Sequence, residues 1–258
     1  VMPCANSLGY FENRREEGRV DPNRDFPFVQ DRTKCFQSMA ARAVNEVMRS
    51  HLFQTALTFH GGMQAIAYEW GSPIHPKQGH RDTSPDDASQ LALSQSLSKF
   101  GGHGAYSSNK DYPFRPMNSL VYPVNGGMED WAYAASWETK EASGRPTVPR
   151  CSARGYPSEK SMYSTSMLRV FNLLVETSDD KTPRPETLGG MEGLLHPGAS
   201  DREGNGHIAR NVRLSLEALD AVQPYLEWDF HAMENDSNAK PLRRVFFPAG
   251  GEAGGEAG

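Results

Sequence analysis

Two side chains that could do chemistry follow the two most strand-like segments of this sequence. His60 comes directly after residues 52–59, which have the pattern of a buried strand, and Glu176 directly follows residues 167–175, the most apolar segment. An imidazole can bind a metal ion, and a carboxylate can act as a general base. Ligands of open α/β sheets bind beyond the carboxyl ends of the strands. Both residues are therefore expected at such an edge, although a histidine at a strand end is more often structural.

Helices are expected to flank these strands. Apolar residues at helical spacing predict a helix over residues 33–51. Ser84 followed by Pro85 and two acids is typical of a helix start, and that helix should run to Phe100 and stop at two glycines. A further helix is predicted over residues 206–223, where Pro224 ends it. Two Gly- and Pro-containing stretches are expected to be long loops, at residues 101–127 and 139–166.

Composition limits the class of protein and its partners. With 258 residues, 37% of them hydrophobic and 23% charged, the chain can form one sizeable α/β domain. The net charge is −5 and Lys and Arg are scattered, so nucleic acid is not expected as a partner. No apolar run reaches the roughly 18 residues of a membrane span. Cys4, Cys35 and Cys151 leave two options open, one disulfide with a free thiol or three free thiols.

Five segments carry motifs, in the order Asn6–Tyr10, Val20–Pro27, Thr58–Gly62, Tyr122–Trp131 and Val175-Glu176. In motif and order the sequence resembles the zinc carboxypeptidase family, both its A/B and its N/E branches, over residues 1–228. Val20–Pro27 matches the family's Val-Asp-Leu-Asn-Arg-Asn-Phe-Pro signature at six positions. The resemblance implies an α/β fold with a mixed, mostly parallel central sheet flanked by helices, here missing its first strands.

The resemblance also implies roles for individual residues. His60 would be one of three ligands of a catalytic Zn²⁺, and Glu176 would be the general base that passes a proton from water to the leaving amine. Asn23 and Arg24 would hold the terminal carboxylate of the substrate, because a guanidinium forms two parallel bonds to a carboxylate. Tyr122 would close over that carboxylate.

Two further assignments concern the oxyanion and the side-chain pocket. Arg14, or less well Arg15, matches the arginine that steadies the oxyanion. Glu129 matches the floor of the pocket for the departing side chain, where an acid would favour a C-terminal Lys or Arg. In the family's N/E branch this position usually holds Gln and the acid lies on a different strand, at the position of Gly71 here.

The sequence departs from the family pattern in its metal ligands. No His-x-x-Glu motif precedes Asn6, and the spacing occurs instead at His231 and Glu234, after the final predicted helix. We expect an N-terminally truncated enzyme that binds zinc weakly and has little activity by itself. The alternative is a catalytically dead module that binds peptide C-termini.

The expected function is zinc-dependent hydrolysis of the C-terminal residue of peptides or proteins, with Lys or Arg preferred. Residues 1–228 would form the catalytic domain, residues 229–247 the possible start of a β element, and residues 248–258 a flexible tail rich in Gly, Glu and Ala. The insertion at residues 139–166 could rim the active site. The family resemblance slightly favours a secreted or vesicular location.

Overall fold

The computed structural model describes residues 1–75, 83–102, 111–161, 169–196 and 204–223, and the backbone of residues 225–226 and 245–246. His231, Glu234 and the predicted tail lie outside the described residues, as does the part of the chain in which the 228/229 boundary was placed.

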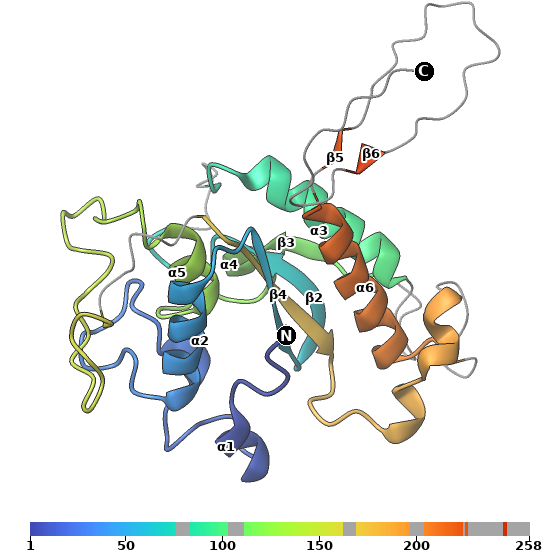
Figure 1. Ribbon diagram of the computed structural model, residues 1–258, viewed down its shortest axis with the longest axis horizontal. Helices are drawn as coiled ribbons and strands as arrows, with labels where there is room; N and C mark the ends of the chain where they lie inside the picture. Colours follow the sequence, from blue (N-terminus) through green and yellow to red (C-terminus); the bar gives the residue numbers. More distant parts are fainter. Residues whose placement is uncertain are drawn as a thin grey trace, which may run out of the picture.

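A four-stranded sheet forms the centre of the molecule (Figure 1). Its order is β1-β4-β2-β3, with bounds Thr55–His60 for β1, Met63–Tyr68 for β2, Phe114–Pro116 for β3 and Phe171–Ser178 for β4. The pairs β1/β4 and β2/β3 are parallel, and β2/β4 is antiparallel. This confirms the predicted mixed, mostly parallel sheet.

The central position of β4 follows from its sequence. Leu173, Leu174 and Val175 are all buried, as a strand covered on both faces requires. The strand begins four residues later than predicted and ends at Ser178, so Glu176 lies inside β4 and not beyond it.

Strand β2 was not predicted, and its position explains the Gly61-Gly62 pair. The strands β1 and β2 do not pair with each other, because β4 lies between them. The two glycines therefore carry the chain across the end of β4, where the amide of Gly62 donates to the carbonyl of Ser178 at 2.8 Å. Gly62 has a φ of +136°, which favours glycine.

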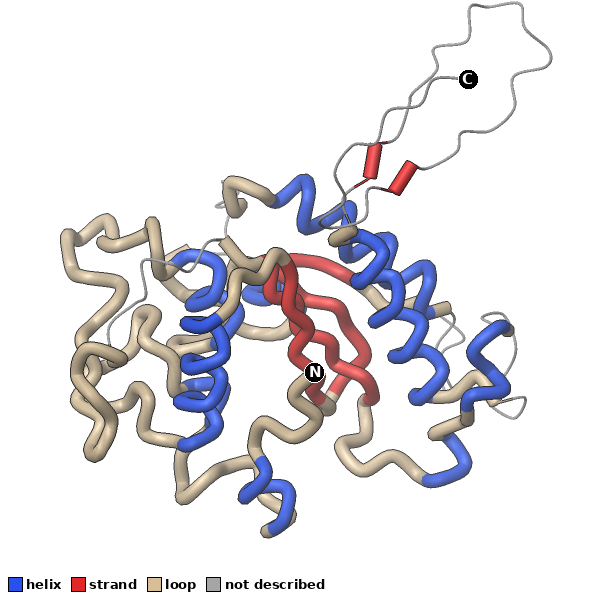
Figure 2. The backbone as a smooth tube through the Cα atoms, viewed as in Figure 1, coloured by secondary structure: helices blue, strands red, loops and turns tan. Residues whose placement is uncertain are grey.

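Helices cover both faces of the sheet (Figure 2). Helices α2 (Met39–Ser50) and α5 (Met128–Ala134) lie on one side, and α3 (Asp87–Gly101) and α6 (His207–Ala221) on the other. One apolar cluster includes Phe36 and Trp131, a second includes Leu97 and Leu214, and a small third one includes Met117 and Leu174. The remaining described elements are short: α1 (Ser7–Phe11), α4 (Met117–Leu120), β5 (Tyr225–Leu226), β6 (Val245–Phe246), and the 3₁₀ segments Pro22–Arg24, Pro185–Thr187 and Met191–Leu195.

Two helices begin later in the sequence than predicted, because the residues at their predicted starts make other contacts. Ser38 caps α2, its hydroxyl accepting from Ala41, so residues 33–37 are not helical. Asp86 is the N-cap of α3, while the Ser84 hydroxyl donates to Gln90 instead. The ends of α3 and α6 lie within two residues of the predicted ones.

A disulfide joins Cys35 to Cys151, which are 116 residues apart, and leaves Cys4 as an exposed free thiol. This decides between the two options that the sequence left open. In the described part of the second predicted loop, residues 139–161, there is no helix or strand. No described helix is long and apolar enough to cross a membrane.

Candidate active site

A cavity opens at the carboxyl ends of β1 and β4 and brings together residues that are distant in the sequence. Five of the seven predicted site residues line it: Asn23, Arg24, His60, Tyr122 and Glu176. Arg15, Lys181 and the Gly61-Gly62 pair also line it, with an apolar wall from Met63, Met117, Val121, Val124 and Leu174.

The register of two parallel strands places His60 beside Glu176. The two residues are direct partners in the β1/β4 pairing. Only 9% of Glu176 is exposed, and its Oε2 atom has no hydrogen-bond partner among the described residues. Burial raises the pKa of Glu176, while Arg15 and Lys181 act against that rise. A carboxyl with a raised pKa is a stronger base once ionised, which suits a group that must take up a proton and pass it on.

His60 is a neutral imidazole under most conditions. Burial, with a further contribution from Arg15, lowers the pKa of His60 to about 4. Its Nε2 atom lies 3.3 Å from Nδ2 of Asn23. A neutral ring is the form that can donate a lone pair to a metal ion.

Arg24 and Tyr122 form the polar end of the cavity. The Nη2 group of Arg24 donates to the Tyr122 hydroxyl at 3.1 Å, and the guanidinium lies 5.7 Å from the centre of that ring. Tyr122 is 54% exposed, so it lies on the rim. No carboxylate pairs with the Arg24 guanidinium within the described residues, which leaves it able to bind one from a ligand.

Gly126 connects the loop that bears Arg24 with the loop that bears Tyr122. The amide of Phe26 donates to its carbonyl at 3.0 Å, and its own amide donates to the carbonyl of Phe28 at 2.9 Å. Its φ is +69°, and a Cβ atom there would collide with the carbonyl of Arg24. Only glycine fits this position.

Of the two adjacent arginines, Arg15 lines the cavity and Arg14 does not. The Arg15 Nε group donates to Asp21 at 2.7 Å, which fixes the position of a guanidinium that lines the cavity. Arg14 lies instead in a separate hollow with Glu12, Glu16 and Arg19. Adjacent residues of the same type gave no sequence signal to separate them.

Glu129, the predicted pocket floor, does not line the cavity. It is fully buried in the first turn of α5, and its Oε1 atom accepts from Nδ2 of Asn23 at 3.1 Å. Its Oε2 atom has no partner among the described residues, and burial raises the pKa of Glu129. At Gly71, the alternative position for an acid, a side chain would collide with Met117.

The described part of the 139–166 insertion lies away from the cavity. Ser152 donates to the carbonyl of Arg32 at 2.6 Å, and Lys160 pairs with Glu46 of α2 at 2.9 Å. No residue of 139–161 lines the cavity. The prediction that this insertion rims the active site is therefore not supported for its described part.

The described residues do not form a complete zinc site. No group of three His, Cys, Asp or Glu side chains in the described ranges could hold a metal ion. His60 is a single candidate ligand, whereas catalytic zinc takes three from the protein.

A family model described as zinc carboxypeptidase matches residues 7–141, just over half of the chain. The chain belongs to the zinc carboxypeptidase family. The matched segment of the chain contains Asn23, Arg24, His60 and Tyr122, and it ends before Glu176.

Two known proteins are similar to this zinc carboxypeptidase family member. Carboxypeptidase SOL1 of Arabidopsis thaliana is 29% identical over 138 residues, which is 52% of this chain and 28% of that protein. The crystal structure of the carboxypeptidase A from Helicoverpa armigera superposes with a TM-score of 0.46 at 15% identity, covering 84% of this chain and 50% of that one. The chain thus spans less than a third of the curated relative's length.

Proposed function

We propose that this chain carries the substrate-binding and general-base residues of a carboxypeptidase that removes the last residue of peptides. One observation carries the proposal: Asn23, Arg24 and Tyr122 converge on the cavity that also holds the His60 and Glu176 pair. A site that reads chain ends needs a carboxylate receptor next to a group that can move a proton.

In this proposal Arg24 and Tyr122 bind the terminal carboxylate of the peptide. The Arg24 guanidinium supplies charge-assisted bonds, and the exposed Tyr122 hydroxyl already lies within 3.1 Å of it. The substrate carboxylate would take its place between these two groups. Binding energy from this end then orients the scissile bond toward His60 and Glu176.

Glu176 is proposed as the general base that takes a proton from the attacking water and delivers it to the leaving amine. Arg15 takes over the role first assigned to Arg14, because it is the member of the doublet that lines the cavity. Its guanidinium would stabilise the negative charge that develops on the carbonyl oxygen.

Zinc is part of the proposal through the family description and through His60 alone. Elemental analysis of the purified chain tests it separately from peptide binding. About one zinc per chain supports the hydrolase, as catalytic sites require. Absence of zinc, together with retained peptide binding, would show that this chain by itself binds peptide C-termini without acting as a zinc enzyme.

The preference for a C-terminal Lys or Arg rests on Glu129. In its favour, Glu129 contacts Asn23, which lines the cavity, and has one oxygen unpartnered among the described residues. Against it, the Glu129 side chain is fully buried and does not line the cavity. Peptides ending in Lys, Arg, Phe or Glu test the preference. Faster cleavage or tighter binding of the Phe or Glu peptide would remove it.

We also propose a secreted or vesicular location. The Cys35–Cys151 disulfide supports it, because such bonds persist in oxidising compartments.

The test of the function compares one peptide with its C-terminal amide. The free acid should bind more tightly, and Arg24→Met should abolish the difference while Arg169→Met, which changes an arginine outside this cavity, should not. Loss of a charge-assisted pair costs about 2 kcal/mol, roughly a thirtyfold weaker binding. Equal binding of acid and amide by the parent chain would refute the proposal.

A further inference from the structure

The cavity brings together three groups of residues. Arg24 and Tyr122 lie at one end, and Asn23 connects them to His60 through its 3.3 Å contact. His60 and Glu176 are direct partners in the β1/β4 pairing and line the same cavity. Beyond them the Gly61-Gly62 pair crosses the end of β4 and meets Lys181, a residue that sequence reasoning did not single out.

Lys181 packs closely against the glycine pair. A Cβ atom added at Gly61 would lie 3.6 Å from the Cα atom of Lys181, and one added at Gly62 would lie 3.2 Å from its Cε atom. The side chain therefore extends along the backbone that follows His60. Its position at the cavity is set by β4, which ends three residues earlier at Ser178.

Lys181 is the cation of the cavity without an assigned role in binding the substrate, although its charge lowers the pKa of Glu176. Arg15 is paired with Asp21 at 2.7 Å, and Arg24 faces Tyr122. Within the described residues no hydrogen bond or ion pair joins Lys181 to a carboxylate. The neighbouring Asp180 carboxylate accepts instead from the amide of Thr182 at 3.2 Å.

We propose that Lys181 selects peptides with an acidic residue immediately before the scissile bond. This inference rests on the proposed function. If the terminal carboxylate lies at Arg24 and the scissile bond at His60 and Glu176, the preceding residue must pass Gly61-Gly62 and reach Lys181. At the glycine pair the Lys181 side chain takes the place that a larger residue's side chain would fill, and its ammonium group provides the counter-charge.

The expected effect is modest, because Lys181 is exposed. A solvent-exposed ion pair changes affinity by about two- to fivefold. The effect should weaken as salt is added, since the Debye length shortens from about 10 Å at 0.1 M to about 3 Å at 1 M.

The experiment uses two peptides that end in the same residue and differ only in Glu or Gln at the preceding position. Dissociation constants are measured on the full chain carrying Glu176→Gln, so that cleavage cannot consume the peptide. The Glu peptide should bind about two- to fivefold more tightly. Lys181→Met should bring this ratio to one, and Lys181→Glu should reverse it. Lys99→Met, an exposed lysine outside the cavity, should leave it unchanged.

Different results separate the two proposals. Equal binding of both peptides, with the free terminal carboxylate still required, overturns the role of Lys181 and leaves the proposed function intact. A Glu preference that survives Lys181→Met also overturns it. If neither peptide binds better than its C-terminal amide, the proposed function fails and this inference fails with it.

Discussion

Asp25 shows how a single departure from the family signature is accommodated. The signature has Asn at this position, and here the fully buried carboxylate accepts from the amides of Gln37 and Ser38 at 2.8 and 2.7 Å and from the Ser38 hydroxyl at 2.7 Å. An ionised carboxylate can accept all three bonds. Asp25 directly follows Arg24, so these bonds attach the segment that bears Arg24 to the start of α2.

The electrostatic link between Arg15 and Glu176 gives the first prediction. Burial raises the pKa of Glu176 and Arg15 lowers it, so Arg15→Met should raise it further. The base must be ionised to act, and the variant should therefore lose its ionised form at a higher pH than the parent. NMR titration of ¹³C-labelled glutamate carboxyls measures this without requiring activity. Arg14→Met is the matched control, and an equal shift in both variants would contradict the assignment of Arg15.

Asp130 gives a prediction about stability. Burial raises its pKa from 3.8 to about 7, and Oδ2 has no partner among the described residues, while Oδ1 accepts from Gly71 at 2.9 Å. The folded state therefore holds this proton more tightly than the unfolded state. Its contribution to stability is full below pH 3.8 and is lost as the pH rises through about 7.

Asp130→Asn keeps the acceptor for Gly71 and removes the charge. The free energy of unfolding of the variant, relative to the parent, should rise between about pH 4 and 8 and then level off. Urea denaturation at several pH values measures it. A difference that is constant across this range would show that Asp130 does not titrate in the folded protein.

At the scale of elements, the backbone of Gly126 couples the loop that bears Arg24 to the loop that bears Tyr122. Gly126→Ala should displace both, because its φ of +69° and the nearby Arg24 carbonyl leave no room for a methyl group. We expect at least a tenfold loss of peptide affinity, since displacing a bidentate carboxylate contact costs about 1.4 kcal/mol or more.

Gly144→Ala is the matched control for that substitution. Gly144 also has a positive φ, +83°, but its surroundings are open. An alanine at Gly144 therefore has the same kind of backbone strain as one at Gly126, without a steric clash. Peptide affinity and circular dichroism should be measured on both variants. If the two lose affinity equally, the contact with Arg24 is not the cause.

Sequence patterns predicted the elements whose signals are local and missed those that depend on partners. The apolar run of β4 and the glycine stop of α3 were recognisable, because burial and capping leave a mark on the residues themselves. Strand β2 was missed because its partner, β4, lies more than one hundred residues further along the chain. The site followed from motifs for Asn23, Arg24, His60 and Tyr122. Lys181 was missed because only the fold brings it to the glycine pair.

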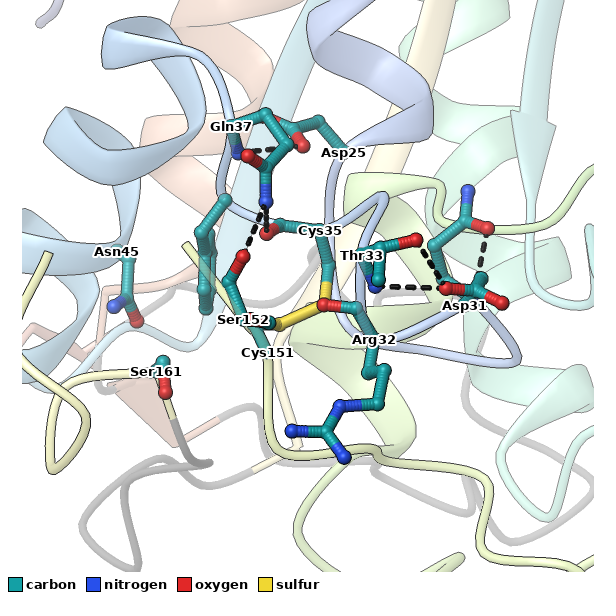
Figure 3. The surroundings of a disulfide bond; sticks show 12 residues. Asp25, Asp31, Arg32, Thr33, Cys35, Gln37, Asn45, Cys151, Ser152 and Ser161 are labelled. Carbon is teal, nitrogen blue, oxygen red and sulfur yellow. Dashed lines mark hydrogen bonds between the residues drawn. A yellow bond between two sulfur atoms is a disulfide. The ribbon is translucent and has the colours of Figure 1, made fainter. Parts of the chain in front are cut away.

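At the scale of the molecule, the disulfide connects the loop next to Arg24 with the 139–161 segment. Figure 3 shows Gln37 at this junction, where its side-chain amide donates to the carbonyls of Cys35 and Ser152 at 2.8 and 3.2 Å and its backbone amide donates to Asp25. The covalent link and these bonds hold the segment that positions Arg24.

Replacing both cysteines of the disulfide, as Cys35→Ser with Cys151→Ser, should lower the free energy of unfolding by about 2 to 5 kcal/mol, because the closed loop is long. Peptide affinity should fall as well. Chemical denaturation and the acid-against-amide binding ratio measure the two effects, with Cys4→Ser as the control. Unchanged stability would mean that the segment is held by its hydrogen bonds alone.

The attachment of residues 139–161 to α2, away from the cavity, has a practical consequence. The tip of this segment at Gly144 has open space around it. A fluorescent dye or an affinity handle introduced there would report on the protein or immobilise it without altering any side chain of the cavity.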